Sequence, residues 1–275
     1  MHTYNPRSEL PAWPDMQSRT PNPSILEPDL AVYDVGLLKE IRGRLLTQDL
    51  KVLCVIGAHK FEELPLINRV FPGLRQIYLF EPLAEPLQEL HRLAKKDARI
   101  KVFPFAVSDV DGTAIFNVAN NDGESSSLLN LGSHKEHFPR VQMDKSIEVP
   151  TRRLDTVLSE HGLEAPDAMI VDVQGAEYLV LKSFSPAIVR QLRLLYTEVS
   201  TEQIYESSGL LRDVEALLSP RFANLGFAPI GPDVRVHGNA VFVAHDDVQL
   251  ILAFTWQERV RRGFHRIKRR LRGRG

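Results

Sequence analysis

Four acidic residues of the sequence stand where they could take part in chemistry. Glu81, Asp172 and Glu198 each lie at or near the end of a short apolar run, and Glu177 follows closely on Asp172. In open α/β sheets, ligands bind beyond the carboxyl ends of the strands. We therefore expect these carboxylates to line one crevice, where they would bind a ligand or transfer a proton.

Glu81 is the first of these acids and has a position suited to binding a nucleoside. Upstream, Gly57 and Ala58 form a turn where a ligand can approach the backbone closely. Glu81 follows Gly57 by about 24 residues, close to the spacing at which an acid reaches the hydroxyls of a bound ribose. A carboxylate can accept hydrogen bonds from both hydroxyls. The alternatives are a simple tight turn and a merely solvated acid.

Asp172, Glu177 and Glu198 are the candidate catalytic residues. A carboxylate beside an acceptor hydroxyl could remove its proton, while most of the acceleration of a group transfer comes from alignment of the reactants. Glu177 could instead cap a helix or form an ion pair. No set of His, Asp and Glu residues has a convincing metal-ligand spacing, so we predict no metal site. A divalent ion among these three carboxylates is the alternative.

Two histidines lie in a polar loop that follows Ser127. His134 and His137 could approach a substrate there, and an imidazole can act as a base near neutral pH. Surface histidines without a catalytic role are the alternative interpretation.

The elements that position these residues alternate along the chain. Short β-branched and apolar runs alternate with helical patterns, which is typical of βαβ units around a mostly parallel sheet. We expect strands at 51–58, 76–80, 100–107, 147–150, 168–172 and 192–199, a hairpin arm at 113–118, helices at 62–71, 83–95, 154–158 and 207–218, and a closing strand pair at 227–230 and 239–244.

Motifs at the ends of these expected strands occur in a recognisable order. They are Ile56-Gly57-Ala58, Phe80-Glu81-Pro82, Ala106-Val107-Ser108-Asp109 with Asp111-Gly112, Ser126-Ser127-Leu128, Val149-Pro150-Thr151 with Leu154-Asp155, Ile170-Val171-Asp172-Val173-Gln174-Gly175-Ala176-Glu177, and Glu198. This succession resembles the FkbM family of S-adenosylmethionine (SAM) dependent methyltransferases.

The resemblance implies the class I methyltransferase fold, a Rossmann-like, doubly wound α/β fold with a mostly parallel seven-stranded sheet and an antiparallel last strand. It implies SAM as the cofactor and O-methylation of a hydroxyl. In that interpretation Gly57 and Ala58 line the methionine part of SAM and Glu81 holds its ribose. The full set of expected cofactor-binding residues is Gly57, Ala58, Glu81, Pro82, Val107, Ser108, Asp109 and Asp172.

Three positions depart from the family pattern. Val55 stands where the family usually has an acid, Phe61 where it has a further glycine, and Gln174 where it has Glu. These changes are compatible with an enzyme that has an altered cofactor site, with a domain that binds without catalysis, or with a site for another ligand.

We therefore expect a SAM-dependent O-methyltransferase that acts on a hydroxyl of a saccharide, glycoconjugate or related natural product. The alternative is a noncatalytic binding or scaffold protein with a degenerate SAM loop. A nicotinamide-dependent oxidoreductase is a third candidate, disfavoured because the first loop lacks the required glycines.

The two ends of the chain differ from its body. Residues 1–28 are rich in proline and predict a disordered arm, 29–248 form the expected methyltransferase domain, and 249–275 predict a basic amphipathic helix or tail. From 259 to 275 there are nine Lys or Arg and no acid, although the net charge of the chain is −1. Such a segment favours an anionic membrane surface or an acidic protein partner, ahead of nucleic acid.

The sequence also favours a cytoplasmic protein, with the tail allowing a peripheral position at the inner face of the membrane. It has no secretory signal pattern and no apolar run of about 18 residues. The single cysteine, Cys54, lies inside an apolar run and is predicted to fill the core.

Overall fold

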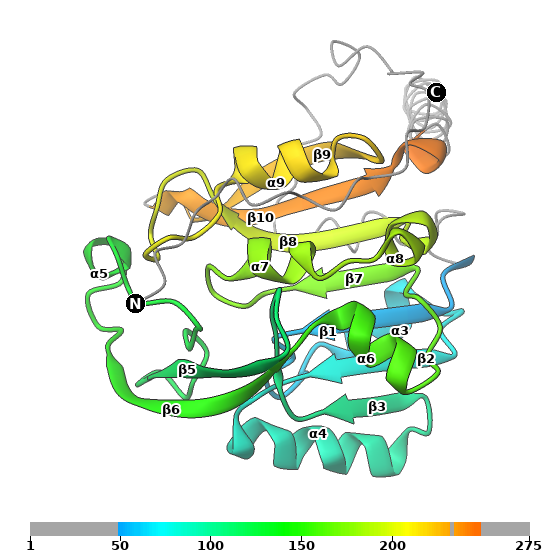
Figure 1. The fold of residues 1–275 in the computed structure, drawn as a ribbon, viewed down its shortest axis with the longest axis horizontal. Helices are drawn as coiled ribbons and strands as arrows, with labels where there is room; N and C mark the ends of the chain where they lie inside the picture. Colours follow the sequence, from blue (N-terminus) through cyan, green and yellow to red (C-terminus); the bar gives the residue numbers. More distant parts are fainter. Residues whose placement is uncertain (1–48, 232–233, 249–275) are drawn as a thin grey trace, which may run out of the picture.

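The computed structural model of the protein describes residues 49–231 and 234–248 (Figure 1). The predicted arm at 1–28 and tail at 249–275 lie outside these ranges. Within them the chain forms two sheets and a set of short helices.

The larger sheet has seven strands in the order β3-β2-β1-β7-β8-β10-β9. The strands from β3 to β8 run parallel, and β10 is antiparallel to both of its neighbours. This topology confirms the predicted mostly parallel sheet with an antiparallel last strand. The bounds are β1 (Val52–Ile56), β2 (Gln76–Phe80), β3 (Ile100–Phe103), β7 (Ala168–Val171), β8 (Leu194–Ser200), β9 (Phe222–Gly231) and β10 (Val234–Ala244).

Both faces of this sheet are buried, and β1 shows why. Its residues alternate between two core clusters: Val52 and Cys54 belong to one, Leu53 and Val55 to the other. Side chains of a strand point alternately to opposite faces, so a strand covered on both sides reads as a continuous apolar run. Cys54 is fully buried, which confirms its prediction as a core residue.

Helices supply the rest of both clusters. The helices α6 to α9 contribute to the cluster that includes Cys54, while α3 and α4 contribute to the other; in Figure 1, α6 to α9 lie in front of the sheet. The sequence did not indicate α5, α7 or α8, which are only four to six residues long. The bounds are α3 (Leu64–Val70), α4 (Ala84–Lys96), α5 (His134–His137), α6 (Leu154–Glu160), α7 (Glu177–Lys182), α8 (Pro186–Gln191) and α9 (Leu211–Leu218).

A smaller sheet of three strands, in the order β4-β6-β5, corrects two expectations. The run at 100–107 was predicted as one strand, but it divides into β3 and β4 (Ala106–Val107), which belong to different sheets. Pro104 stands between them and has no N–H for a sheet ladder. The predicted hairpin arm is β5 (Gly112–Ala119), and its partner is the distant β6 (Met143–Arg152). In Figure 1 this sheet and α5 lie at the side to which β3 and β7 point.

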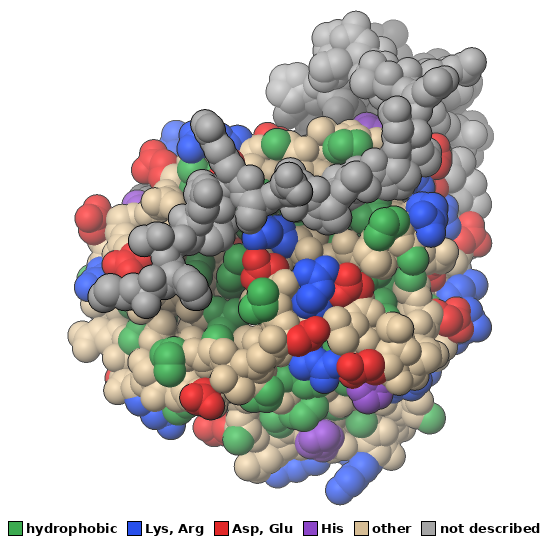
Figure 2. Space-filling model, viewed as in Figure 1, with side chains coloured by type: hydrophobic (Ala, Val, Ile, Leu, Met, Phe, Trp, Pro, Cys, Tyr) green, Lys and Arg blue, Asp and Glu red, His purple; other side chains and the backbone are tan. Residues whose placement is uncertain are grey.

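The described surface carries charges of both signs. On the face in Figure 2, basic and acidic side chains are intermixed, and the ion pairs Arg152 with Asp111 and Arg153 with Asp155 are examples of this mixing. Among the residues that the structure describes, no helix has the length and apolar character needed to cross a bilayer.

Candidate active site

Glu81 lies at the carboxyl end of β2, in the wall of a pocket. Its carboxylate is only 5% exposed. One oxygen accepts a hydrogen bond from the backbone N–H of His59 at 2.9 Å, and the other accepts one from that of Leu83 at 2.8 Å. Burial raises the pKa of Glu81, and these two N–H donors oppose that shift. Each oxygen retains a lone pair for a ligand hydroxyl.

Gly57 is required by the turn that follows β1. Its φ is +79°, and a Cβ at this position would lie 1.7 Å from the carbonyl oxygen of Asp172. The N–H groups of Gly57 and Ala58 both bond to the carbonyl of Phe80, at 3.1 and 3.0 Å. The turn therefore brings the ends of β1, β2 and β7 together without space for a side chain.

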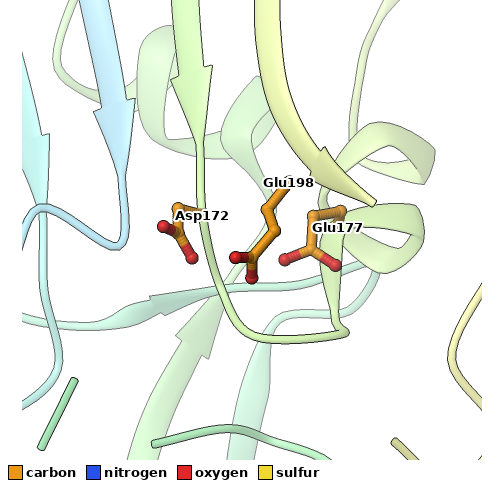
Figure 3. Close-up of side chains that lie close together, drawn as sticks. All are labelled: Asp172, Glu177 and Glu198. Carbon is orange, nitrogen blue, oxygen red and sulfur yellow. The ribbon is translucent and has the colours of Figure 1, made fainter. Parts of the chain in front are cut away.

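Three carboxylates meet beside this turn (Figure 3). Asp172 follows β7, Glu177 begins α7 and Glu198 belongs to β8, and one oxygen of each lies within 4.8 Å of the others. Asp172 is exposed, whereas Glu177 and Glu198 are buried. The structure thus brings together all three predicted catalytic residues.

Burial keeps two of these carboxyl groups from ionising readily. Desolvation, followed by the charge of Glu198, raises the pKa of Glu177 to about 8. Desolvation also raises the pKa of Glu198 well above its ordinary value, and the charge of Asp172 and a hydrogen bond with it act in the same direction. A protonated Glu198 is therefore the state that this environment favours.

Gln174 connects the carboxylates. Its Nε2 lies 2.7 Å from an oxygen of Asp172 and 2.7 Å from an oxygen of Glu198. A side-chain amide has two N–H donors, so both contacts are satisfied at once. The oxygens of the three carboxylates are close enough together to surround a cation. The amide of Gln174 points its N–H groups at two of these carboxylates, and the hydrogen bonds counter their charge.

His237 is a further polar residue of this site. It lies on β10, is 2% exposed, and its Nε2 is 3.1 Å from Oε1 of Glu198. It was not predicted from the sequence, because a lone histidine in an apolar strand is indistinguishable from a core histidine. His134 and His237 both line a second cavity, beside the pocket at Glu81. His134 is buried, and desolvation lowers its pKa to about 4. The lining of that cavity does not include His137.

Four non-glycine residues of the site have left-handed backbones: His59, Phe61, Asp122 and Gln174, with φ between 44° and 61°. Such conformations are costly and are often found at functional sites. The ring of Phe61 is buried in the core, as is the side chain of Val55. The two departures in the first loop are thus accommodated by packing.

The pocket at Glu81 opens into a larger cavity. The first has a volume of about 540 Å³, its open mouth included, and its walls include Glu81, Phe80 and Phe105. The second, of about 1710 Å³ with its mouth, reaches Glu198 and His237. The two share Gly57, His59, Glu124, Asp172 and Gln174.

Most of the expected cofactor-binding residues border these spaces. Gly57, Glu81, Pro82, Val107 and Asp172 line the first pocket, and Ala58 lines the second. Ser108 and Asp109 are not part of either wall.

Asp109 has a structural partner instead. Its carboxylate forms an ion pair with Lys182 at 2.6 Å, and it accepts a weak hydrogen bond from Ser108.

This combination of a doubly wound sheet, a buried acid at the end of β2 and a carboxylate cluster at the end of β7 defines a protein of the class I methyltransferase type. The family model of the methyltransferase FkbM domain matches residues 56–229. The chain belongs to this family.

One relative and two solved structures are among the proteins similar to the chain. The 2-O-methyltransferase NoeI of Sinorhizobium fredii (strain NBRC 101917 / NGR234) is 33% identical over 162 residues, which are 57% of this chain and 66% of that protein, slightly less than two thirds.

A methyltransferase FkbM from Methylobacillus flagellatus KT is 18% identical, with a TM-score of 0.48, over 76% of this chain and 50% of that one. Aeropyrum pernix fibrillarin, solved with natively bound S-adenosyl-L-methionine, is 12% identical, with a TM-score of 0.42, over 76% of this chain and 74% of that one. Both TM-scores are below 0.5, so these two do not bear on function.

Proposed function

We propose that the protein is a SAM-dependent O-methyltransferase acting on a hydroxyl of a saccharide, glycoconjugate or related natural product. The observation that carries the proposal is the junction of the two spaces at Gly57 and Asp172. A nucleoside pocket there opens directly onto a polar cavity with a carboxylate at its entrance. Family membership and the 2-O-methyltransferase relative support the same reaction.

The residues of the first pocket fit the nucleoside part of SAM. The two oxygens of Glu81 are already held by backbone N–H groups, and their remaining lone pairs would accept hydrogen bonds from a pair of ribose hydroxyls. Phe80, Phe105 and Val107 provide apolar walls that suit a purine. When bound, SAM supplies an electrophilic methyl group.

In this proposal Asp172 acts on the acceptor. It is the exposed member of the carboxylate cluster and borders both spaces. Its carboxylate takes up the proton of the acceptor hydroxyl, while the amide of Gln174 holds it in place. The two spaces hold donor and acceptor side by side, which removes much of the entropic barrier.

Calorimetry with S-adenosylhomocysteine tests the cofactor. We expect binding by the intact protein and a loss of at least about tenfold in affinity for Glu81→Ala, because the ribose hydroxyls would lose their carboxylate acceptor in a buried site. Glu85→Ala, at an exposed residue at the start of α4, is the control and should bind as the parent does. No binding by the intact protein would reject the proposal.

Methyl transfer tests the reaction. Labelled SAM and a panel of methyl glycosides of neutral hexoses and N-acetylhexosamines should give labelled ethers with at least one member. Binding of S-adenosylhomocysteine without transfer to the panel or to a cell extract would favour the noncatalytic alternative.

A further inference from the structure

His237 lies beside the carboxylate cluster and is not one of the predicted site residues. It lies opposite Ser200 in the antiparallel pairing of β10 with β8, and both of its ring nitrogens have partners. Nδ1 is 2.9 Å from the hydroxyl of Ser200, and Nε2 is 3.1 Å from Oε1 of Glu198. The imidazole is therefore held in one orientation inside the sheet.

An irregularity of the sheet accompanies this position. The pairing of β10 with β9 shifts register between Val234 and Gly238, next to His237. A Cβ on Gly238 would lie 2.0 Å from the carbonyl oxygen of Ala228, so only glycine fits there. Bulges of this kind redirect side chains and are common beside active sites.

The contacts form a continuous path from the cavity entrance to His237. The path begins at the exposed Asp172, whose carboxyl group lies beside that of Glu198 and raises its pKa. Oε1 of Glu198 lies 3.1 Å from Nε2 of the imidazole. The path consists only of two carboxyl groups and an imidazole, all of which can carry a proton. Gln174 is not part of the path: it lies beside it and donates to both carboxylates.

We propose that His237, acting through Glu198 and Asp172, takes up the proton that the acceptor hydroxyl loses during methyl transfer. This inference rests on the proposed function. His237 is a positioning residue in this scheme, since Asp172 is the group that contacts the acceptor.

Transfer forms a C–O bond and breaks a C–S bond, and the acceptor hydroxyl releases one proton to Asp172. A proton passes from Asp172 to Glu198 while Glu198 gives its own proton to Nε2 of His237. The imidazolium then replaces, within the same cavity, the positive charge lost when the methyl donor becomes neutral. The net charge near the three carboxylates is unchanged.

The directions of the pKa shifts of His237 and Glu198 suit this path. Desolvation lowers the pKa of His237, although the charges of Glu177 and Asp172 act against that shift. The pKa of Glu198 is raised. His237 is therefore neutral and faces a protonated Glu198. From α5, His134 is the further titratable group in its surroundings, and the ring of Phe138 covers one side.

Kinetic measurements on variants provide one test. The substrate is a methyl glycoside of the panel that the parent protein methylates. His237→Asn should lower kcat at pH 7 by about 100-fold, the usual contribution of a proton-accepting group, with acceptor KM and affinity for S-adenosylhomocysteine within about twofold of the parent. The deficit should narrow as the pH rises, because hydroxide replaces the missing acceptor. A merely structural role would lower kcat equally at every pH.

Two further variants sharpen this test. Glu198→Gln should show the same deficit, and the double variant should be no slower than either single one, since both break one path. His245→Asn is the control, because His245 follows β10 at its other end and bonds to the carbonyl of Ser219. Additive losses in the double variant, or a parent-like pH profile for His237→Asn, would overturn the proposal.

Nitrogen-15 NMR of the histidine rings tests the path without any acceptor, so its failure is distinct from failure of the proposed function. At pH 7, with and without S-adenosylhomocysteine, His237 should be neutral and its Nε2 should carry no proton. A doubly protonated His237 at pH 7 could not accept a proton and would reject the inference, even if the protein proves to be a methyltransferase.

Discussion

The phenol hydroxyl of Tyr205 donates a hydrogen bond of 2.7 Å to Oε1 of Gln174. Burial, with the charges of nearby carboxylates, raises the pKa of Tyr205 far above its ordinary value, so the phenol remains a donor. The amide oxygen of Gln174 is thereby fixed on the side of Tyr205. Its N–H groups must then point toward Asp172 and Glu198.

Gln174→Glu should disturb this arrangement. The change removes two N–H donors and adds a fourth acid to a site that already contains three, so we expect a loss of about 1–3 kcal/mol in the free energy of unfolding at pH 8. Urea denaturation measures it. Gln88→Glu, on the exposed side of α4, is the control. A Gln174→Glu protein as stable as the control would show that the amide is not needed to counter the carboxylates.

Gly57→Ala should affect both folding and binding. The new methyl group would overlap the carbonyl of Asp172, which lies 1.7 Å away, and the left-handed φ adds strain. We expect a loss of more than about 3 kcal/mol in unfolding free energy, since strain alone costs about 1–3 kcal/mol, together with loss of S-adenosylhomocysteine affinity.

Gly162→Ala is the matched control for Gly57. Gly162 has a φ of +58°, but nothing lies within 4 Å of an added Cβ. It reports the conformational cost alone, about 1–2 kcal/mol for an L-residue in this region. Urea denaturation measures the unfolding free energy of both variants. Equal losses would mean that β1 and β7 can move apart to admit a methyl group at little cost.

Asp172→Asn should separate binding from transfer. The two side chains have the same shape and can both accept from Gln174, so affinity for S-adenosylhomocysteine should change little, whereas kcat should fall by about 10²- to 10⁴-fold with loss of the base. Labelled methyl transfer and calorimetry on one preparation measure both. An unchanged kcat would mean that another residue of the cavity acts as the base.

Much of the fold could be predicted from the sequence because most strands have a clear hydrophobic pattern. The buried strands β1, β2, β7 and β8 are short apolar runs, and helix α4 shows regular leucine spacing. The pairing of β5 with β6 could not be foreseen, because a loop of more than 20 residues separates them. Antiparallel partners so far apart leave no local turn signal.

Some residues of the site could likewise be predicted from the sequence, and others could not. Asp172 and Glu198 are predicted because each follows or ends an apolar run, and Glu177 because it follows closely on Asp172. Strand ends meet at one edge of the sheet. His237 and the orientation of Gln174 depend on contacts between residues far apart in the sequence. Neither residue type carries a spacing rule that would reveal such contacts.

The pH dependence of stability gives a further prediction. Because burial raises the pKa of Glu177 to about 8, from 4.5, the folded protein holds a proton that the unfolded chain releases between these values. The contribution of this group to stability is therefore fully present below about pH 4.5 and declines as the pH rises toward 8. Glu177→Gln should remove this decline. Its Oε1 can still accept from the N–H groups of Val173 and Gly175.

Urea midpoints measured from pH 5 to pH 8.5 test this directly. The parent and Glu177→Gln should have similar stability near pH 5, and the variant should be the more stable by on the order of 4 kcal/mol at pH 8.5. Some decline should persist in the variant, because the pKa of Glu198 is raised as well. Glu85→Gln, at an exposed position of α4, should follow the parent at every pH. A Glu177→Gln protein less stable than the parent at pH 8.5 would mean that ionised Glu177 stabilises the fold.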